Sequence, residues 1–400
     1  MDTLVLKKGK ERSLLRRHPW IYDTAMAGVQ GSPRAGDTVR VVDAAGRFLA
    51  LAAYAPESGI RARCWTFEEA TVVDEAFVAE RLRRALAARR RLAARTNAVR
   101  EVFGEADGLP GLIVDRYAAF YVTQFLSCGA ERFRQTILRT LAEQEGIEGV
   151  YDRSDAATRA REGLAPASGT AFGKEPPERI DVVENGVRYA VDVRNGHKTG
   201  FYIDQRENRL LAAGLARRFL EENGRGMRVL NCFCYTGGFS LALAAGGAAE
   251  VIGIDSSAEA IALARHNAQL NAAESVARFV EDDVFAYLKR ARDEGQSFDL
   301  VILDPPKFAS SHRQVERAAR AYKDINLRAL RIIAPGGQLL SFSCSGAIDG
   351  DLFQKIVASA VIDSGRDAWM VSRLGAGEDH PLMMTCPEGE YLKGVLLKVL

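Results

Sequence analysis

The chain lacks several features that define other classes of protein. No hydrophobic run approaches the roughly 18 apolar residues that a membrane-spanning helix needs, and the N-terminal segment carries charges where a signal peptide needs an apolar core. The six cysteines, at positions 64, 128, 232, 234, 344 and 386, show neither a paired zinc spacing nor a disulfide-dense pattern. We therefore expect a cytoplasmic protein with no membrane contact and no bound metal.

Net charge is also nearly absent, but it is unevenly distributed. The 400 residues are 47% hydrophobic and 26% charged, which leaves room for two or three domains. Residues 1–100 hold 19 basic and 11 acidic side chains, so this part carries +8 while the whole chain carries only +2. A basic N-terminal part favours an anionic partner such as nucleic acid. The alternative is a solvated basic helix, because seven arginines fall within one predicted helix over 74–95.

The pattern along the chain predicts three parts. Residues 1–70 alternate apolar and polar positions between turns, which indicates a small β-rich domain. Residues 71–190 mix the basic helix with strands, a helix near 130–145 and an expected loop over 161–178, so we predict a central α+β domain. From 191 to 400, apolar strands alternate with helices, which predicts an α/β, Rossmann-like domain with a doubly wound parallel sheet.

The first strand of the Rossmann-like part ends in a glycine turn. Asn231 to Phe239 reads NCFCYTGGF, and Gly237 and Gly238 let the backbone pass close to a ligand. A helix start of this kind could also accept a phosphate. The next strand ends in Asp255, whose carboxylate can accept both hydroxyls of an adenosine ribose. The chain has no G-x-G-x-x-G fingerprint, so the pattern favours S-adenosylmethionine over NAD.

A third strand ends in acidic residues. Asp283 is placed to accept from an adenine amino group, or else it caps the helix that starts at Val284. Cys232 and Cys234 flank the end of the first strand, where packing is the simpler interpretation.

Two later strand ends predict the reaction. Asp304 opens the sequence DPPKF, and Cys344 lies in SFSCSG at the end of the next apolar strand. An Asp-Pro-Pro turn presents polar groups to a planar base, and a cysteine nucleophile suits methylation of a pyrimidine carbon, because thiolate attack at C6 makes C5 nucleophilic. Asp304 would bind the N3 or amino edge of cytosine, and Lys307 would stabilise charge near O2 unless it is only a solvated lysine.

These motifs resemble a known family over essentially the whole chain. The sequence is similar to the bacterial large-subunit ribosomal RNA cytosine-C5 methyltransferases that carry an N-terminal PUA domain. The matching segments are RHPWIY (17–22), FGEADGLPGLIVDRY (103–117), YDRSD (151–155), GHKTGFYIDQRENR (196–209), LNCFCYTGGFS (230–240), DPPKF (304–308), YKDIN (322–326), SFSCSG (341–346) and PEGEYLKG (387–394).

The resemblance implies a PUA domain, a central domain of β-β-α-β-β type and a class I methyltransferase domain. It implies S-adenosylmethionine as the cofactor, 23S rRNA as the partner and Cys344 as the nucleophile. It also places Gln205 and Arg206 near cofactor or RNA. Related RNA enzymes carry a second cysteine after Asp-Pro, which this chain lacks, so product release needs another base or water.

The candidate residues fall into three groups. For catalysis they are Cys344, Asp304 and Lys307. For the cofactor they are Asn231, Tyr235, Thr236, Gly237, Gly238, Asp255, Asp283, Asp304 and Gln205. For RNA they are Arg12, Arg16, Arg17, Arg61 and Arg206.

Other readings remain open at this stage. An amino-group N-methyltransferase also uses Asp-Pro-Pro, but Lys307 displaces the following aromatic and Cys344 would have no task. A ribosome-assembly factor with an inactive domain would be expected to lack the glycines, Asp255 or Cys344. The N-terminal domain could be purely structural. The sequence does not decide which cytosine is modified, whether naked rRNA or a particle is the substrate, or whether the protein forms a homodimer.

Overall fold

The computed structural model describes residues 1–154, 156–309 and 312–400, so the last residue of the YDRSD motif lies outside the described residues. These residues form two units. Unit 1 comprises Met1–Val182, Val191–Ile203 and Asp379–Gly389, and unit 2 comprises Val183–Ala190, Asp204–Glu378 and Glu390–Leu400. The limits 1–70, 71–190 and 191–400 stay a prediction.

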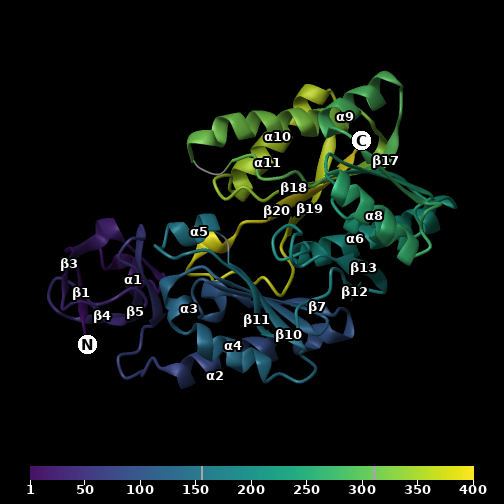
Figure 1. The fold of residues 1–400 in the computed structure, drawn as a ribbon. Helices are drawn as coiled ribbons and strands as arrows, with labels where there is room; N and C mark the ends of the chain where they lie inside the picture. The colour runs from purple at the N-terminus through teal and green to yellow at the C-terminus, as the bar shows by residue number, and fades with distance from the viewer. Residues whose placement is uncertain (155, 310–311) are drawn as a thin grey trace. The chain divides into compact units, whose positions relative to one another are not determined.

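Unit 1 begins with a six-stranded sheet in the order β2-β6-β5-β4-β1-β3 (Figure 1). Its strands are β1 (Thr3–Leu6), β2 (Trp20–Tyr22), β3 (Met26–Gln30), β4 (Thr38–Val42), β5 (Phe48–Tyr54) and β6 (Ile60–Thr66). The short helices α1 (Arg12–Leu15) and η1 (Asp23–Ala25) lie in the connections. Alternating side chains such as Leu4, Leu6, Val39 and Val41 are fully buried and form its core, as the period of two predicts.

A five-stranded sheet follows, in the order β11-β10-β9-β8-β7. Its strands are β7 (Ala98–Phe103), β8 (Leu112–Tyr117), β9 (Phe120–Phe125), β10 (Gly149–Ser154) and β11 (Ala167–Gly173). Its helices are α2 (Glu75–Arg89), η2 (Arg90–Ala94), η3 (Gly104–Asp107), α3 (Cys128–Arg132), α4 (Arg134–Ala142) and α5 (Ala156–Ala160). The order β8, β9, α3–α4, β10, β11 matches the expected β-β-α-β-β type, and β7 adds a fifth strand.

Two local predictions can be compared directly with this part. The predicted helix over 74–95 is confirmed as α2 and η2, with Asp74 as the N-cap that accepts from Phe77 N at 2.9 Å. The predicted loop over 161–178 is wrong for Ala167–Gly173, which is the edge strand β11 paired with β10. Its small residues give no apolar alternation, so periodicity could not reveal it.

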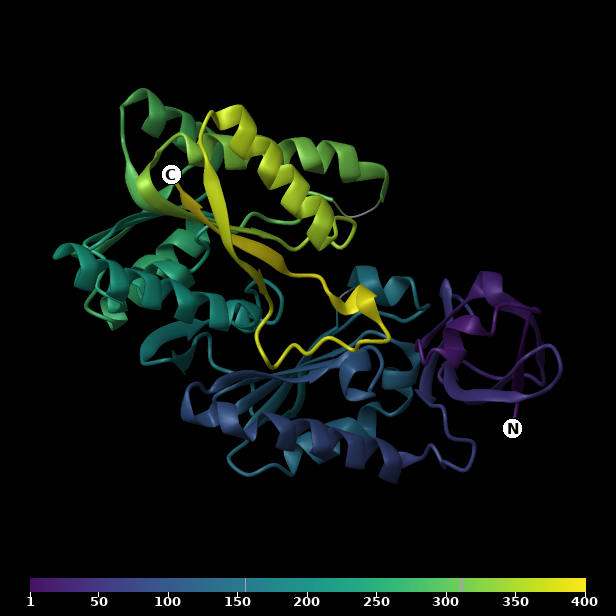
Figure 2. The same ribbon diagram turned by 180° about the vertical axis from the view of Figure 1, so that it is seen from behind.

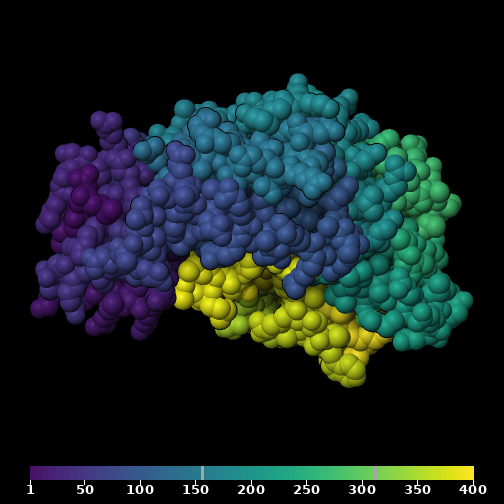
Figure 3. Space-filling model, turned by 90° about the horizontal axis from the view of Figure 1, so that it is seen from below, coloured from purple at the N-terminus to yellow at the C-terminus, as the bar shows by residue number. Residues whose placement is uncertain are grey.

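The first sheet and the part with α2 form one continuous surface (purple and blue in Figure 3).

Unit 2 contains a seven-stranded sheet in the order β16-β15-β14-β17-β18-β20-β19. The strands are β14 (Arg228–Cys232), β15 (Glu250–Asp255), β16 (Ala277–Glu281), β17 (Phe298–Leu303), β18 (Ile333–Ser343), β19 (Ala368–Gly375) and β20 (Lys393–Val399). The first five are parallel, and β20 runs antiparallel to both β18 and β19. Figure 2 shows β19 and β20 side by side in yellow tones. The predicted Rossmann-like fold is therefore confirmed.

Helices cover the sheet of unit 2. They are α6 (Arg206–Asn223), α7 (Gly238–Ala245), α8 (Ala258–Leu270), α9 (Val284–Asp293), α10 (Val315–Leu330) and α11 (Gly350–Ser364). Two further short helices are η4 (Ile203–Gln205) and η5 (His312–Gln314), whereas η6 (Pro387–Gly389) belongs to unit 1. A separate hairpin pairs β12 (Ile180–Glu184) with β13 (Val187–Val191). The fully buried Phe298, Tyr322 and Phe353 join α10 and α11 to the sheet in one apolar core.

The strand order places the candidate site. Strands β15 and β16 lie on one side of β14, whereas β17 and β18 lie on the other. The order therefore reverses between β14 and β17, and ligands of such sheets bind outside the carboxyl ends of the strands at this point. No helix among the described residues is both long and apolar enough to cross a membrane.

Candidate active site

The loop after β14 has an unusual backbone. Phe233, Tyr235 and Gly237 have φ values of 59°, 48° and 87°, and two of them carry side chains that rarely adopt this conformation. A Cβ on Gly237 would lie 2.9 Å from Phe279 Cζ, so glycine is required both for φ and for space. Backbone strain of this kind persists where a surrounding structure holds it and is common at ligand sites.

Asp255 fixes this loop to the end of β15. Its Oδ2 accepts from Tyr235 N at 2.9 Å, and its Oδ1 accepts from Ser257 N at 3.0 Å. The carboxylate is therefore held in one orientation at the carboxyl edge of the sheet. Asn231, at the end of β14, donates Nδ2 to Ser240 Oγ at 2.9 Å. Its buried Oδ1 has no hydrogen-bond partner among the described residues, which leaves an acceptor ready for a ligand.

A chain of amides leads from α6 to the end of β17. Gln205 Nε2 donates to Asp304 Oδ2 at 3.0 Å, and Asn208 Nδ2 donates to Gln205 Oε1 at 2.6 Å. Asn208 also donates to Gly375 O at 2.9 Å. Because Gln205 is buried and held on both sides, it fixes the direction of the Asp304 carboxylate. A site role was predicted from the sequence for Gln205 but not for Asn208, although both lie in the motif GHKTGFYIDQRENR.

Cys344 lies beside this carboxylate turn. It follows β18, which neighbours β17, and its Sγ is 4.0 Å from Pro305 O. The serines on either side of it are tied to one phenol: Ser343 Oγ donates to Tyr322 OH at 3.0 Å, and Ser345 Oγ is 3.1 Å from the same oxygen. This network holds the cysteine loop in place while the thiol itself is partly exposed.

Lys393 lies at the start of β20, opposite Ser343. It is not among the candidate residues predicted from the sequence. Its buried Nζ donates to Ser345 O at 2.9 Å. Burial lowers the pKa of Lys393 below its ordinary value, whereas the charge of Glu390 and a thiolate at Cys344 act to raise it. The ammonium is therefore electrostatically coupled to the cysteine. Its position in the motif PEGEYLKG, which follows the last parallel strand, is the sequence feature that could have indicated a role for Lys393 at the site.

Comparison with known sequences and structures adds independent information. A family described as S-adenosylmethionine-dependent methyltransferase matches residues 120–382, and a PUA-like domain matches residues 4–67. The chain belongs to the S-adenosylmethionine-dependent methyltransferases. It is 46% identical to ribosomal RNA large subunit methyltransferase I of Klebsiella pneumoniae, over 99% of this chain and 98% of that protein. The Escherichia coli protein of the same name is also 46% identical, over 99% of each chain.

Solved structures agree with the methyltransferase fold. A Streptococcus mutans protein described as a SAM-dependent methyltransferase superimposes with a TM-score of 0.83, at 21% identity over all of both chains. A methyltransferase crystallised with S-adenosylhomocysteine gives a TM-score of 0.85, also at 21% identity over all of both chains. The expected division into a PUA-like domain and a methyltransferase fold is thus confirmed, as is the cofactor.

The residues of this methyltransferase fit S-adenosylmethionine. The glycine turn, the oriented Asp255 and the unpaired Oδ1 of Asn231 converge at the edge where the parallel strands end. Thr236 is buried in the same loop, and its carbonyl accepts from Asn267 Nδ2 at 3.0 Å. Asp283 is exposed and caps α9 by accepting from Ala286 N at 2.8 Å. It therefore has the helix-capping role that was the alternative to binding adenine. Its contact with adenine stays a prediction.

Several further candidates can be placed. Lys307 is exposed beyond the Asp-Pro-Pro turn, and its charge acts on Lys393. Cys232 and Cys234 are buried, and burial raises the pKa of both thiols, which agrees with packing. Arg206 is buried, with its Nε 3.8 Å from Glu184 Oε2. This position favours a structural role, and a contact of Arg206 with cofactor or RNA stays a prediction.

The remaining arginine candidates lie in unit 1. Arg12, Arg16 and Arg17 are exposed in or next to α1, and Arg61 is half-buried in β6. Arg17 has a φ of 61° and its guanidinium carbon lies 5.6 Å from the centroid of the Phe67 ring. A contact with RNA stays a prediction for all four.

One group of metal-ligand types lies outside the methyltransferase site. His18, Cys386 and Glu388 come together in unit 1 with ligand atoms within 4.8 Å of one another. His18 Nδ1 accepts from Trp20 N at 3.2 Å, so Nε2 carries the proton and donates to Glu388 Oε2 at 3.0 Å. Burial raises the pKa of Cys386 to about 12, which keeps the thiol protonated.

Proposed function

We propose that this protein methylates C5 of one cytosine in 23S ribosomal RNA through a transient bond between Cys344 and C6 of the base. The relatives at 46% identity are named ribosomal RNA large subunit methyltransferase I, which supports a large-subunit rRNA as the substrate. A ribosomal substrate also fits a cytoplasmic enzyme. The choice of the ring carbon rests on this chain's own residues.

The observation that carries the proposal is the position of the thiol. Cys344 and Asp304 follow neighbouring parallel strands, and Cys344 Sγ lies 4.0 Å from the carbonyl of the residue after Asp304. A cytosine whose N3 edge binds Asp304 would thus have a nucleophile beside its ring. Methylation of an exocyclic amine needs no such nucleophile.

The residues divide the work as follows. The thiolate of Cys344 forms a bond to C6, and the electron pair of the C5–C6 double bond makes C5 nucleophilic. S-adenosylmethionine, when bound, would supply the electrophilic methyl group for C5 and would be converted to S-adenosylhomocysteine. A base or water then removes the C5 proton, the Cys344–C6 bond breaks, and the double bond returns. Asn231, Asp255 and the turn at Gly237 would hold the cofactor.

Two cations assist in this proposal. Lys393 stabilises the thiolate form of Cys344, because its buried ammonium lies at the base of the same loop. Lys307 lies on the open side of the Asp-Pro-Pro turn, where it can approach negative charge that develops at O2 of the base. Asp304, held by Gln205, hydrogen-bonds the N3 or amino edge and fixes the ring in place.

A mechanism-based substrate tests the covalent step. RNA that contains 5-fluorocytidine cannot lose a proton from C5, so a Cys344–C6 adduct should accumulate and survive denaturing electrophoresis. We expect this adduct with the wild type and with Cys64→Ala, a cysteine packed in the first sheet, but not with Cys344→Ser. An equal adduct in Cys344→Ser would contradict the proposal.

The rival reaction makes a different prediction. In an amino-group methyltransferase, the aromatic after Asp-Pro-Pro stacks on the base. Here the Phe308 ring lies 4.8 Å from the Tyr322 ring and packs against the apolar core, so its position does not favour that role. Methyl groups found on an exocyclic amine would decide for the rival.

A further inference from the structure

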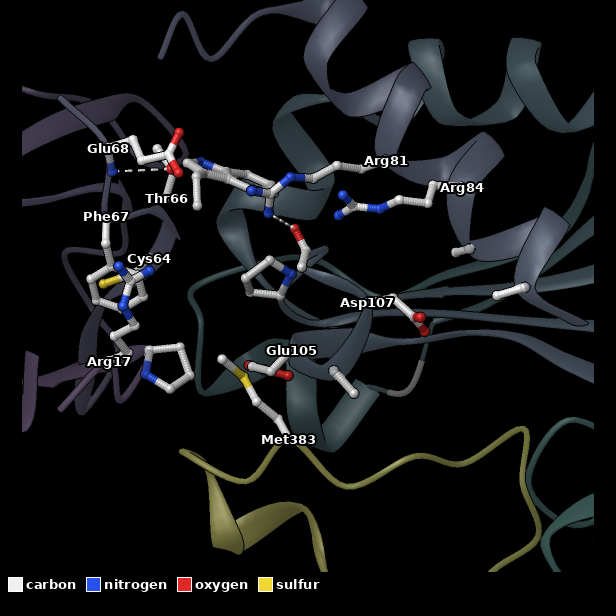
Figure 4. Close-up of a pocket in the computed structure, with 17 residues that line it drawn as sticks. Arg17, Cys64, Thr66, Phe67, Glu68, Arg81, Arg84, Glu105, Asp107 and Met383 are labelled. Carbon is white, nitrogen blue, oxygen red and sulfur yellow. Dashed lines mark hydrogen bonds between the residues drawn. The ribbon is translucent and has the colours of Figure 1, made fainter. Parts of the chain in front are cut away.

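Unit 1 contains a cleft of about 550 Å³ between the end of the first sheet and helix α2 (Figure 4). Its walls come from the loop after α1, from β6 and the residues that follow it, from one face of α2, and from η3. The volume falls within the ~300–1,000 Å³ typical of sites for small ligands. The proposed catalytic residues are not part of it, because they belong to unit 2.

Arginines from two segments line this cleft. Arg81 and Arg84 lie one turn apart on α2, and Arg17 enters from the opposite wall beside Phe67 (Figure 4). Arg81 is anchored, because its Nη1 donates to Gly108 O at 2.6 Å and its guanidinium carbon lies 4.2 Å from the centroid of the Phe77 ring. Arg17 and Arg84 are exposed, and neither forms an ion pair within the described ranges.

The acids of the cleft do not neutralise these cations. Asp107 is engaged by Arg89 through contacts of 2.5 and 2.9 Å and also accepts from Phe103 N. Glu105 forms an ion pair at 3.7 Å with Arg63, which does not line the cleft, and it also accepts from Trp20 Nε1 at 2.8 Å. Glu68 acts on Arg81, since its charge raises the pKa of that arginine. The cleft therefore keeps a positive potential that favours an anion.

The two arginines of α2 repel each other. The pKa of Arg81 is lowered to about 10, first by burial and then by the positive charge of Arg84, against the opposing effect of Glu68. A phosphate bound to Arg84 would offset this repulsion. Arg17 is held at a positive φ of 61°, a conformation that non-glycine residues rarely adopt. Such strain is common where a side chain is positioned for a ligand.

An aromatic partner makes the cleft suitable for a base as well as a phosphate. The guanidinium of Arg17 lies over the Phe67 ring, 5.6 Å from its centroid, and so presents a flat cationic face. Bases of single-stranded RNA stack on arginine planes and aromatic rings while their phosphates bind cations. An acidic protein segment would use the charges but not the flat face.

We propose that this cleft binds one nucleotide of an unpaired RNA segment, with the phosphate on Arg17 and Arg84 and the base against the Arg17–Phe67 pair. The proposal rests on the proposed function, because it takes the RNA to be the rRNA substrate. It also narrows the sequence prediction, since Arg17 lines the cleft whereas Arg12, Arg16 and Arg61 do not. The cleft would thus position the RNA while the catalytic residues act on the target base.

Charge variants with a matched control test the phosphate contacts. Full-length protein and an unmodified 23S rRNA transcript would be used in filter binding between 50 and 200 mM salt. Arg17→Gln and Arg84→Gln should each weaken binding roughly tenfold and reduce the slope of log K against log salt by about 1. Arg83→Gln removes the same charge from α2 outside the cleft, and its affinity should stay within about twofold of the wild type. Equal losses in all three variants would overturn the proposal.

A neutral substitution tests occupancy without changing charge. Ala87 and Ala88 are both exposed on α2, but Ala88 lines the cleft and Ala87 does not. Ala88→Trp should weaken RNA binding about tenfold by filling the cleft, and Ala87→Trp should not. RNA affinity unchanged in Ala88→Trp would overturn the proposal.

Failure of the proposed function can be distinguished from failure of the cleft proposal. Wild-type protein that binds the transcript but methylates an exocyclic amine would refute the reaction, and the RNA affinities of the cleft variants would still test the cleft. Wild-type activity with cleft variants that bind like Arg83→Gln would refute only the cleft. A poly-glutamate peptide that competes as well as RNA at equal charge would also overturn the choice of ligand.

Discussion

Lys393→Met is the change that tests most sharply how the thiol is activated. Lys393 is 5% exposed and donates Nζ to Ser345 O at 2.9 Å, next to Cys344 in the chain. The coupling is reciprocal: a thiolate at Cys344 acts to raise the pKa of Lys393, so the ammonium must favour the thiolate. Removing the ammonium should therefore shift the titration of the thiol to higher pH.

The size of the effect follows from the position of the charge. An opposite charge within about 4–6 Å shifts the pKa of a group by roughly 1–3 units. Cys344 is partly exposed, so solvent screens the interaction and the lower value applies. A shift of about 1 unit corresponds to about 1.4 kcal/mol and to a tenfold smaller thiolate fraction at neutral pH. The rate of methyl transfer should fall by about the same factor if attack on C6 limits it.

Alkylation by iodoacetamide gives the direct readout. The other five cysteines, at positions 64, 128, 232, 234 and 386, are buried, so labelling of native protein reports Cys344. The pH midpoint of the alkylation rate should rise by about 1 unit in Lys393→Met. It should change little in Lys393→Arg, which keeps the charge.

Lys398→Met is the matched control, because it makes the same change on the same strand. Lys398 pairs with Gln338, at the end of the β18–β20 pairing away from Ser343 and Lys393. Loss of the bond to Ser345 O also costs stability, so thermal unfolding and cofactor affinity must be compared in the same variants. If Lys393→Met and Lys398→Met give the wild-type pH profile, Lys393 does not activate the thiol.

Two further predictions concern the cofactor and stability. Asp255→Ala should weaken S-adenosylmethionine binding at least tenfold in calorimetry, because it removes the acceptor and frees the Tyr235 loop. The affinity of the variant for RNA should stay within about twofold of the wild type. A cofactor affinity equal to that of the wild type would contradict this role. Burial raises the pKa of Glu101 from 4.5 to about 7 in the folded protein, so the folded state binds the extra proton and stability should fall by up to about 3 kcal/mol as pH rises from 4.5 to 7. Glu101→Gln should flatten this dependence in chemical denaturation, and an unchanged pH slope would refute the assignment.

The sequence predicted what depends on local pattern. The strand expected to end in Asp255 and the strand expected before DPPKF are confirmed as β15 (Glu250–Asp255) and β17 (Phe298–Leu303). The ends of these strands placed Asp255 and Asp304 at one edge, because parallel strands share their direction. The predicted start of the basic helix at residue 74 is also confirmed, since Asp74 is the N-cap of α2.

The parts that the sequence did not predict depend on distant contacts. Strand β11 exists because β10 offers it an edge, and its small residues carry no periodic signal of their own. Lys393 reaches the Cys344 loop only because β20 inserts antiparallel beside β18, almost fifty residues later in the chain. Whether Arg17 and Arg84 share a cleft likewise depends on how β6 packs near α2.

The central claim is that Cys344 attacks a cytosine ring to allow methylation at C5. The most direct measurement incubates purified protein with unmodified 23S rRNA and labelled S-adenosylmethionine, digests the RNA and identifies the labelled nucleoside by mass spectrometry. The account predicts 5-methylcytidine with the wild type and with Cys64→Ala, and no labelled product with Cys344→Ala, which should still bind S-adenosylmethionine. Label on an exocyclic amine, or 5-methylcytidine at a comparable rate from Cys344→Ala, would contradict it.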